Sequence, residues 1–220
     1  MYIPEHFRVH DHAEAIAFMR ANPFAILVSS PVASTPVASS DDGPFATHLP
    51  VFVVEAAERV VLRGHVAKAN PHWRYLEQQP HCLTIFHGPH AYVSASNYTT
   101  RENVPTWNYG AVHVYGKARV FASPEDLQGV LEQLISTFEP AYAEQWASLD
   151  KTYRERMLSH IVGFEIAVTR IEAKFKLSQN RTKEEQANVI ASLEKAEDTA
   201  VSGVARLMCE QGLGAKKEGT

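Results

Sequence analysis

The sequence predicts a mostly β protein with flanking helices, an α+β fold in which one antiparallel sheet closes into a barrel. Six or seven short runs have the apolar alternation of half-buried strands, and clusters of turn-forming residues separate them. Regular helices do not alternate with these runs, which argues against a parallel doubly wound sheet. The pattern becomes helical after residue 180, so we expect a barrel domain over residues 1–180 and a C-terminal helical extension over residues 181–220.

The first half of the chain contains most of the expected strands. Asp11 and Glu14 fit a capping box that begins the first helix. The segment 30–43 is rich in Pro, Ser and Ala and predicts a long mobile loop. Asn70 and Pro71 fit the N-cap and the first position of a short second helix. We expect helices over residues 11–21 and 70–79, and strands over residues 24–29, 45–54, 60–67, 81–87 and 91–94.

The second half adds two longer strands and most of the helices. Ser123 and Pro124 begin a helix of about four turns with one apolar face. Thr182 and Glu185 fit another capping box, and Gly212 ends the last helix. The expected elements are strands over residues 111–120 and 161–176 and helices over residues 123–138, 150–160, 182–193 and 199–211, followed by a frayed tail over residues 216–220.

Composition excludes several classes of protein. The chain has 220 residues, of which 45% are hydrophobic and 21% charged, as in ordinary globular proteins. Its net charge of −4 shows no basic excess that would favour nucleic acid. The apolar runs are far too short to span a bilayer, and the N-terminus lacks the pattern of a signal peptide. Cys82 and Cys209 lie far apart, so we expect no disulfide framework, a buried inert Cys82 and a cytoplasmic location.

Motifs of common enzyme classes are missing. The chain has no Gly-rich dinucleotide loop, no Walker loop and no serine-centred nucleophile elbow, which disfavours a kinase or a hydrolase. Eleven histidines raise the question of a metal, and His72, His81, His87 and His90 lie close in sequence. No pair has the spacing of a zinc helix and no cysteine pair assists, so we expect no metal. No catalytic residue can be named.

Three blocks between residues 62 and 109 have an unusual composition. They cover residues 62–73, 86–92 and 104–109, and each joins an apolar run to a turn rich in Gly, Pro, His, Asn or aromatic residues. Such a mixture is typical of a site that encloses a flat ligand with polar edges. Lys68, next to the start of a helix, suits a phosphate group, because it adds a point charge to free N–H donors. The alternative for Lys68 is a solvated surface lysine.

Other polar residues of these runs have two interpretations each. His48 and His65 lie within expected strands and are either ligand contacts or hydrogen-bonded core histidines. Trp107, Asn108 and Tyr109 offer flat faces with polar edges, which can flank an aromatic ring system. The alternative for these three residues is a wedge between a loop and the core, or a subunit interface.

At these blocks the chain resembles a known family, the PaiB family of FMN-binding negative transcriptional regulators. The resemblance runs from Met1 to about Leu193. Many irregular motifs in one order make it specific. They are Phe45-Ala46-Thr47-His48-Leu49-Pro50, Gly64-His65-Val66-Ala67-Lys68-Ala69-Asn70-Pro71, Phe86-His87-Gly88-Pro89-His90-Ala91-Tyr92-Val93-Ser94, Val104-Pro105-Thr106-Trp107-Asn108-Tyr109 and Lys176-Leu177-Ser178-Gln179-Asn180-Arg181.

The resemblance implies an FMN-binding split β-barrel, like that of pyridoxamine-phosphate oxidases and flavin reductases, which is usually a homodimer with FMN at the interface. It implies that Lys68 binds the phosphate. It also implies that the strand 47–49 lines the edge of the isoalloxazine ring, and that residues of the C-terminal strand end reach the cofactor. The cofactor-binding residues expected on this basis are Thr47, His48, Leu49, His65, Val66, Lys68, Trp107, Asn108, Gln179 and Arg181.

One departure from the oxidase pattern bears on affinity. The oxidases carry an arginine on the strand before this lysine, whereas residues 45–54 contain no basic residue except His48. Arg63 is the nearest substitute. Three outcomes remain open for this chain: weak FMN binding, an empty pocket, or a pocket used by another ligand.

The resemblance leads to two functional hypotheses. The first is an FMN-binding PaiB-type negative transcriptional regulator that acts as a homodimer. The second is a flavin-dependent oxidoreductase of the pyridoxamine-phosphate-oxidase-like group, in which the flavin accepts hydride. The net charge of −4 and the missing helix-turn-helix pattern favour indirect regulation, through a protein partner or a metabolite, over direct contact with DNA.

Overall fold

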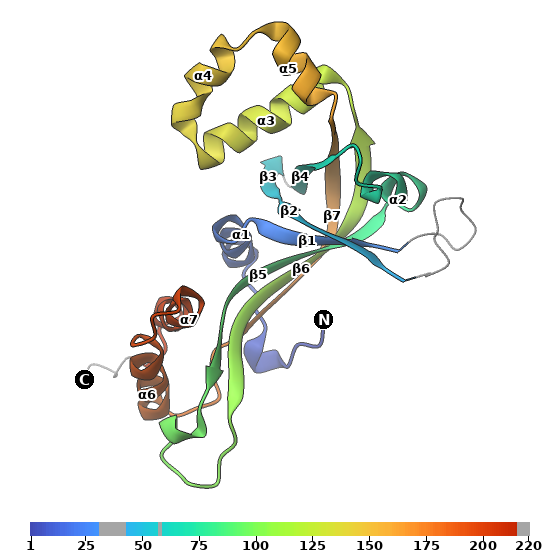
Figure 1. Ribbon diagram of the computed structural model, residues 1–220. Coiled ribbons are helices and arrows are strands. Elements are labelled where there is room, and N and C mark those ends of the chain that lie inside the picture. Colours follow the sequence, from blue (N-terminus) through green and yellow to red (C-terminus); the bar gives the residue numbers. More distant parts are fainter. Residues whose placement is uncertain (31–42, 57–58, 215–220) are drawn as a thin grey trace. The chain divides into compact units, whose positions relative to one another are not determined.

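The computed structural model describes residues 1–30, 43–56 and 59–214 (Figure 1). The expected loop at 30–43 and the expected frayed tail at 216–220 therefore fall almost wholly outside the described residues. The described chain forms two compact units, each built from separate stretches of sequence. The first unit comprises Met1–Phe18, His87–Val112 and Glu172–Thr220, and the second comprises Met19–Phe86 and His113–Ile171. The domain boundary expected at residue 180 stays a prediction.

Within the described residues, seven strands form one sheet in the order β2-β1-β5-β6-β7-β4-β3. Strand β1 pairs antiparallel with β2 and β5, and β4 pairs antiparallel with β3 and β7. The α+β fold class with an antiparallel sheet is therefore confirmed. The strands are β1 Phe24–Ser29, β2 Phe45–Pro50, β3 Phe52–Ala56, β4 Arg59–Ala67, β5 His81–Val93, β6 Thr106–Phe121 and β7 Ile161–Lys176.

Helices α3, α5, α6 and α7 each begin at a residue whose side chain caps them. Ser123 Oγ accepts a hydrogen bond from the Asp126 amide at 3.3 Å, and Thr182 and Glu185 form the expected capping box. The 3-10 helices and α4 were not predicted; η1, η3 and α4 have no side-chain cap, whereas η2 follows Ser94, whose hydroxyl accepts from the Ser96 amide. The helical elements are η1 Glu5–Phe7, α1 His12–Ala21, α2 His72–Gln78, η2 Ala95–Asn97, α3 Pro124–Phe138, η3 Pro140–Tyr142, α4 Ala143–Ser148, α5 Lys151–Leu158, α6 Lys183–Leu193 and α7 Thr199–Glu210.

The single strand expected over residues 45–54 was wrong, because the chain divides it into β2 and β3. The two strands lie at opposite edges of the sheet. Between them, the Val51 amide donates to the Pro23 carbonyl at 2.8 Å, outside the strand ladders. The preceding Pro50 has no N–H to donate, so it suits the end of an edge strand.

Strands β5 and β6 are longer than expected. Residues 87–90, expected as a turn, continue β5, with exposure that alternates out of phase on either side of Gly88 and Pro89. Such a shift is typical of a β-bulge. Strand β6 begins at Thr106, so Trp107 and Asn108 are strand residues and not part of a turn.

Gly64 and Phe164 face each other across the β4–β7 pair. Phe164 is 1% exposed. A Cβ placed on Gly64 would lie 2.7 Å from the Phe164 ring and 3.2 Å from the Pro50 carbonyl oxygen. The glycine therefore lets the aromatic ring approach the β4 backbone closely, which a side chain would block. Packing fixes β4 just before the segment that carries Lys68.

Candidate functional site

Lys68 lies directly after β4, and its backbone is fixed on both sides. Its amide donates to the His160 carbonyl at 2.7 Å, and its carbonyl accepts from Trp73 Nε1 at 3.0 Å. The residue is exposed and lines a cavity of about 170 Å³ together with residues of α3, α5 and β7. Within the described ranges, its ammonium group has no hydrogen-bond or ion-pair partner. The Lys68 backbone is therefore held in place while its ammonium group stays available for a ligand.

Thr47, Asn70 and His72 join β2 to the start of α2. Thr47 Oγ1 accepts from Asn70 Nδ2 at 3.1 Å and lies 2.7 Å from His72 Nδ1. Asn70 Oδ1 accepts from the His72 amide at 3.0 Å in the turn before α2. The expected cap at Asn70 was one residue early, because α2 begins at His72 and Pro71 occupies the cap position. The Thr47 hydroxyl is therefore used inside the unit, where it holds the turn after Lys68 against β2.

His72 is fully buried, and burial lowers its pKa from 6.5 to about 4. Its Nε2 has no partner among the described residues, so the protonated ring would be poorly accommodated. The folded state keeps His72 neutral while the unfolded chain binds a proton below about pH 6.5. We therefore expect stability to fall as the pH drops from about 6.5 to 4, by up to about 1.4 kcal/mol per pH unit.

Urea denaturation of the wild type and of His72→Gln at several pH values tests this expectation. The stability difference between the two proteins should shrink as the solution is acidified, because only the wild type loses the histidine contribution. A difference that stays constant between pH 7 and pH 4.5 would contradict it. His12→Gln, which removes an exposed histidine at the start of α1, is the matched control.

The remaining candidates of this unit divide between exposed and buried positions. His48 is exposed on β2, with its ring centroid 6.3 Å from that of the exposed Phe24. Leu49 and Val66 are buried core residues, 4% exposed each. His65 on β4 is half-buried, and burial lowers its pKa. His48 is thus the side chain of this group that a ligand reaches most directly.

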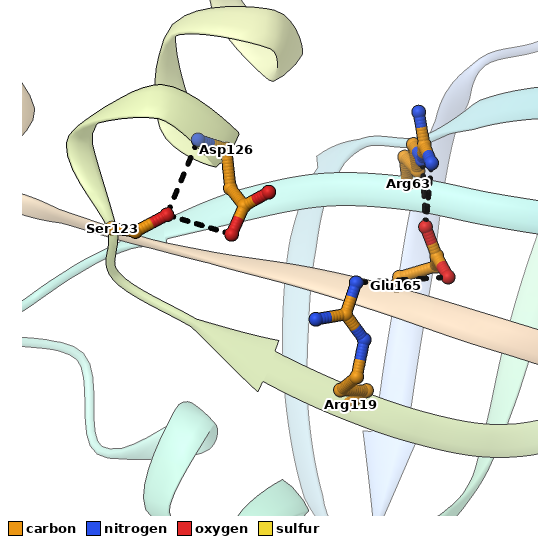
Figure 2. A network of polar contacts seen from close by, with 5 residues as sticks. All are labelled: Arg63, Arg119, Ser123, Asp126 and Glu165. Atoms are coloured by element: carbon orange, nitrogen blue, oxygen red, sulfur yellow. Dashed lines mark hydrogen bonds and ion pairs between the residues drawn. The ribbon is translucent and has the colours of Figure 1, made fainter.

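Arg63, the substitute for the missing strand arginine, is engaged elsewhere. It faces Glu165 across the β4–β7 pair and donates from Nε to Glu165 Oε2 at 2.8 Å, with Nη2 at 2.7 Å from the same oxygen (Figure 2). Arg119 approaches the other Glu165 oxygen at 3.9 Å. A phosphate would have to compete with this carboxylate for Arg63. Lys68 therefore supplies the free positive charge of this site, which fits a phosphate but predicts weak binding.

Trp107 belongs to the first unit and lies in an exposed aromatic cluster. Its side chain is 52% exposed and stacks on His90, with ring centroids 5.9 Å apart. Tyr92, itself 54% exposed, meets the Trp107 ring edge-on at 6.2 Å. The flat exposed faces expected at Trp107 are present.

Asn108 is enclosed in the same unit. It is fully buried, and its Nδ2 donates to Ser178 Oγ at 3.0 Å and contacts Met208 Sδ at 3.7 Å. Ser178 has a φ of 65°, in the left-handed region that non-glycine residues rarely adopt. The Asn108 amide anchors this strained turn. Its predicted contact with a cofactor remains a prediction.

Gln179 and Arg181 follow this turn. The Gln179 amide binds backbone at both ends, accepting from the Leu177 amide at 2.7 Å and donating to the Phe175 carbonyl at 2.5 Å. Arg181 Nη1 donates to Asn103 Oδ1 at 2.6 Å. Their contacts with a cofactor stay predictions.

Other reactive groups are accounted for. Across the ranges the structure covers, no three His, Cys, Asp or Glu side chains form a metal cluster. His87 and His90 approach with ring centroids 4.9 Å apart, and burial and then the His90 charge lower the pKa of His87. Cys82 is buried, which raises its pKa to about 12, whereas Cys209 is exposed. No helix in the described part of the chain is long and apolar enough to cross a membrane.

Sequence comparison decides the family. Residues 1–170 match the family described as "Putative FMN-binding domain". The chain is also 39% identical over 210 residues to "Protease synthase and sporulation protein PAI 2" of Bacillus subtilis, covering 94% of this chain and 96% of the relative. The chain belongs to the PaiB family. This membership supports the expected flavin cofactor.

Solved structures agree with the fold of this PaiB-family chain. The FAD and heme binding protein of Mycobacterium smegmatis has a TM-score of 0.56 at 13% identity, covering 77% of this chain and 73% of that one. The conserved hypothetical protein Rv2991 of Mycobacterium tuberculosis has a TM-score of 0.55 at 15% identity, covering 82% and 92%. The likeness concerns the fold alone, and the split β-barrel prediction is confirmed.

Two residues that position the site were overlooked in the sequence. Asn70 and His72 were interpreted as a helix start and a member of a histidine cluster, yet both hold Thr47. The available signal was Asn70 itself, because an Asn side chain often bonds the backbone amide two residues later in an Asx turn. Nothing local in the sequence indicated that the partner would be a threonine on β2.

Proposed function

We propose that this chain is an FMN-binding regulator of the PaiB type that acts as a homodimer. The observation that carries the proposal is the Lys68 ammonium, which is unpaired among the described residues while its backbone is held from both sides. A preorganised cation is what a phosphate monoester requires. The family of FMN-binding domains supplies the identity of the cofactor.

The strands near Lys68 suit the rest of the cofactor. In the proposal, exposed His48 on β2 and half-buried His65 on β4 face the polar edge of the isoalloxazine ring. Buried Leu49 and Val66 keep these strands in place. Thr47 acts through its bonds to Asn70 and His72 and not by direct contact. When bound, FMN would supply an electron-accepting ring at this position.

A regulatory role is supported by the relative named for protease synthesis and sporulation. The net charge of −4 supports regulation through a protein or a metabolite in place of direct DNA contact. The exposed cluster of Trp107, Tyr92 and His90 supports self-association, since aromatic side chains are enriched at protein interfaces. Sedimentation equilibrium that returned only a monomer would overturn the homodimer.

Titration of FMN into wild type and Lys68→Ala at low salt tests the cofactor site. We expect the alanine variant to bind FMN about 10- to 100-fold more weakly, because one charge-assisted contact to the phosphate is lost. Lys117→Ala, which removes an exposed lysine from β6, should bind FMN like the wild type. Riboflavin, which lacks the phosphate, should bind equally to wild type and Lys68→Ala. Equal FMN affinity in Lys68→Ala and wild type would refute the site.

A further inference from the structure

The first unit contains a cavity of its own, of about 210 Å³. Its walls come from three parts of the sequence: Phe7 of η1, the segment 98–106 that leads into β6, and the turn 176–181 that follows β7. All of these residues lie within the first unit. The cavity is smaller than the roughly 300–1,000 Å³ of sites for drug-sized ligands, so its occupant is a small molecule or one end of a larger one.

Two cations line this cavity. Lys176 Nζ binds Thr106 Oγ1 and the Trp107 carbonyl, both neutral acceptors, and keeps one proton for a further bond. Arg181 bonds to Asn103 through Nη1 alone, which leaves other N–H groups of the guanidinium free. None of the described residues that line the cavity carries a carboxylate.

Neither cation is in direct contact with a carboxylate among the described residues. Burial, and then the charges of Lys174 and Arg181, lower the pKa of Lys176. Hydrogen bonds, first from Thr99, and then the charge of Arg181 lower the pKa of Glu185. The Glu185 oxygens accept these hydrogen bonds from the Thr99 amide and hydroxyl and from the Thr182 amide. Among the residues that the structure covers, neither Lys176 nor Arg181 forms an ion pair.

Tyr98 gives an independent indication of a ligand. Its side chain lines the cavity and carries the Arg181 guanidinium over its ring, 3.8 Å from the centroid. The residue is 8% exposed, and within the described ranges its buried hydroxyl has no hydrogen-bond partner. A buried hydroxyl without a partner is costly, and an anion oxygen that enters the cavity far enough to reach it would satisfy it.

We infer that this cavity binds the carboxylate or phosphate group of a small molecule, held by Lys176, Arg181 and the Tyr98 hydroxyl. Phe7 and Pro105 offer apolar contact to the carbon atoms next to the anionic group. The site does not use Lys68, and it assigns Arg181, expected above as a cofactor residue, to this anion instead. It gives a regulator a place to sense a metabolite. It stands whether or not FMN binds at Lys68.

Thermal melting and calorimetric titration with benzoate and inorganic phosphate test the inference at low salt. Benzoate or phosphate should bind saturably and raise the melting temperature, whereas the neutral benzamide should not. Lys176→Gln should weaken anion binding about tenfold or more, and Tyr98→Phe by a few-fold, because charge-assisted bonds are the stronger. Arg206→Gln makes the same charge change on the exposed face of α7 and should leave binding unchanged.

The other outcomes are decisive as well. Failure of both anions to bind, or equal binding of benzamide, overturns the inference. So does unchanged affinity in Lys176→Gln and Tyr98→Phe, two variants that preserve the Arg181 contacts. Lys68→Ala should keep anion binding even if it loses FMN, which separates failure of this site from failure of the cofactor site. Displacement of benzoate by FMN, with FMN binding weakened in Lys176→Gln, would show a flavin phosphate site and overturn the separate one.

Discussion

Replacing Phe164 with alanine is expected to lower the free energy of unfolding by about 3–5 kcal/mol. The ring is 1% exposed and lies against Gly64 on the neighbouring strand. Its loss removes buried apolar surface and leaves a cavity that β4 cannot fill, because Gly64 has no side chain. The β4–β7 pair leads directly to Lys68, so FMN binding should weaken together with stability.

A double-mutant cycle with Gly64 isolates this contact. Gly64→Ala alone should cost about 1–3 kcal/mol, since its methyl group would meet the Phe164 ring and the Pro50 carbonyl. In the Phe164→Ala background the methyl group no longer meets the ring, although the Pro50 carbonyl contact at 3.2 Å remains, so the double variant should be less destabilised than the sum of the two. Urea denaturation measures all four proteins. Additive effects would contradict direct packing of the ring on Gly64.

Replacing Asn108 with leucine is expected to destabilise the fold by about 2–3 kcal/mol. The Asn108 side chain is fully buried and exchanges hydrogen bonds with Ser178 Oγ in both directions. Leucine has a similar size but leaves the buried Ser178 hydroxyl without the hydrogen bonds that Asn108 provides. It also removes the anchor that holds Ser178 at a positive φ.

The partner substitution makes this prediction specific. In Asn108→Leu/Ser178→Ala, both polar groups are gone, so much of the lost stability should return, because matched removal of a buried pair costs little. Gln186 Nε2 still donates to the Ser178 carbonyl and supports the turn in all variants. Chemical denaturation of the two single variants and the double variant provides the measurement. A double variant as unstable as the two losses combined would show that the hydrogen bonds are not the source of the effect.

Local signals predicted much of the fold. Strands β1 and β7 have the expected bounds, because alternation over a bounded run is a local property. The capping box of α6 was also predicted, because both of its residues lie within one turn. The break at Val51 between β2 and β3 was not predicted, because the apolar run 45–54 gives no sign that its two halves belong to opposite edges of the sheet.

The candidate site divides in the same way. The motif around Lys68 predicted a phosphate contact; the structure leaves its ammonium without a partner among the described residues, and the contact itself stays a prediction. The engagement of Arg63 by Glu165 depends on a residue far away in sequence, so no local pattern could reveal it. The same holds for the cavity at Tyr98 and Lys176, whose walls come from three separate stretches.

The separation of β2 and β3 has a consequence for how the chain reaches this structure. The β3–β4 hairpin joins neighbouring segments and can form early, whereas β4 meets β7 only across about a hundred residues. During synthesis one edge of β4 therefore stays unpaired until residues 161–176 leave the ribosome. A nascent chain that ends before β7 would expose that edge to other chains, so truncations there should aggregate while the whole chain folds.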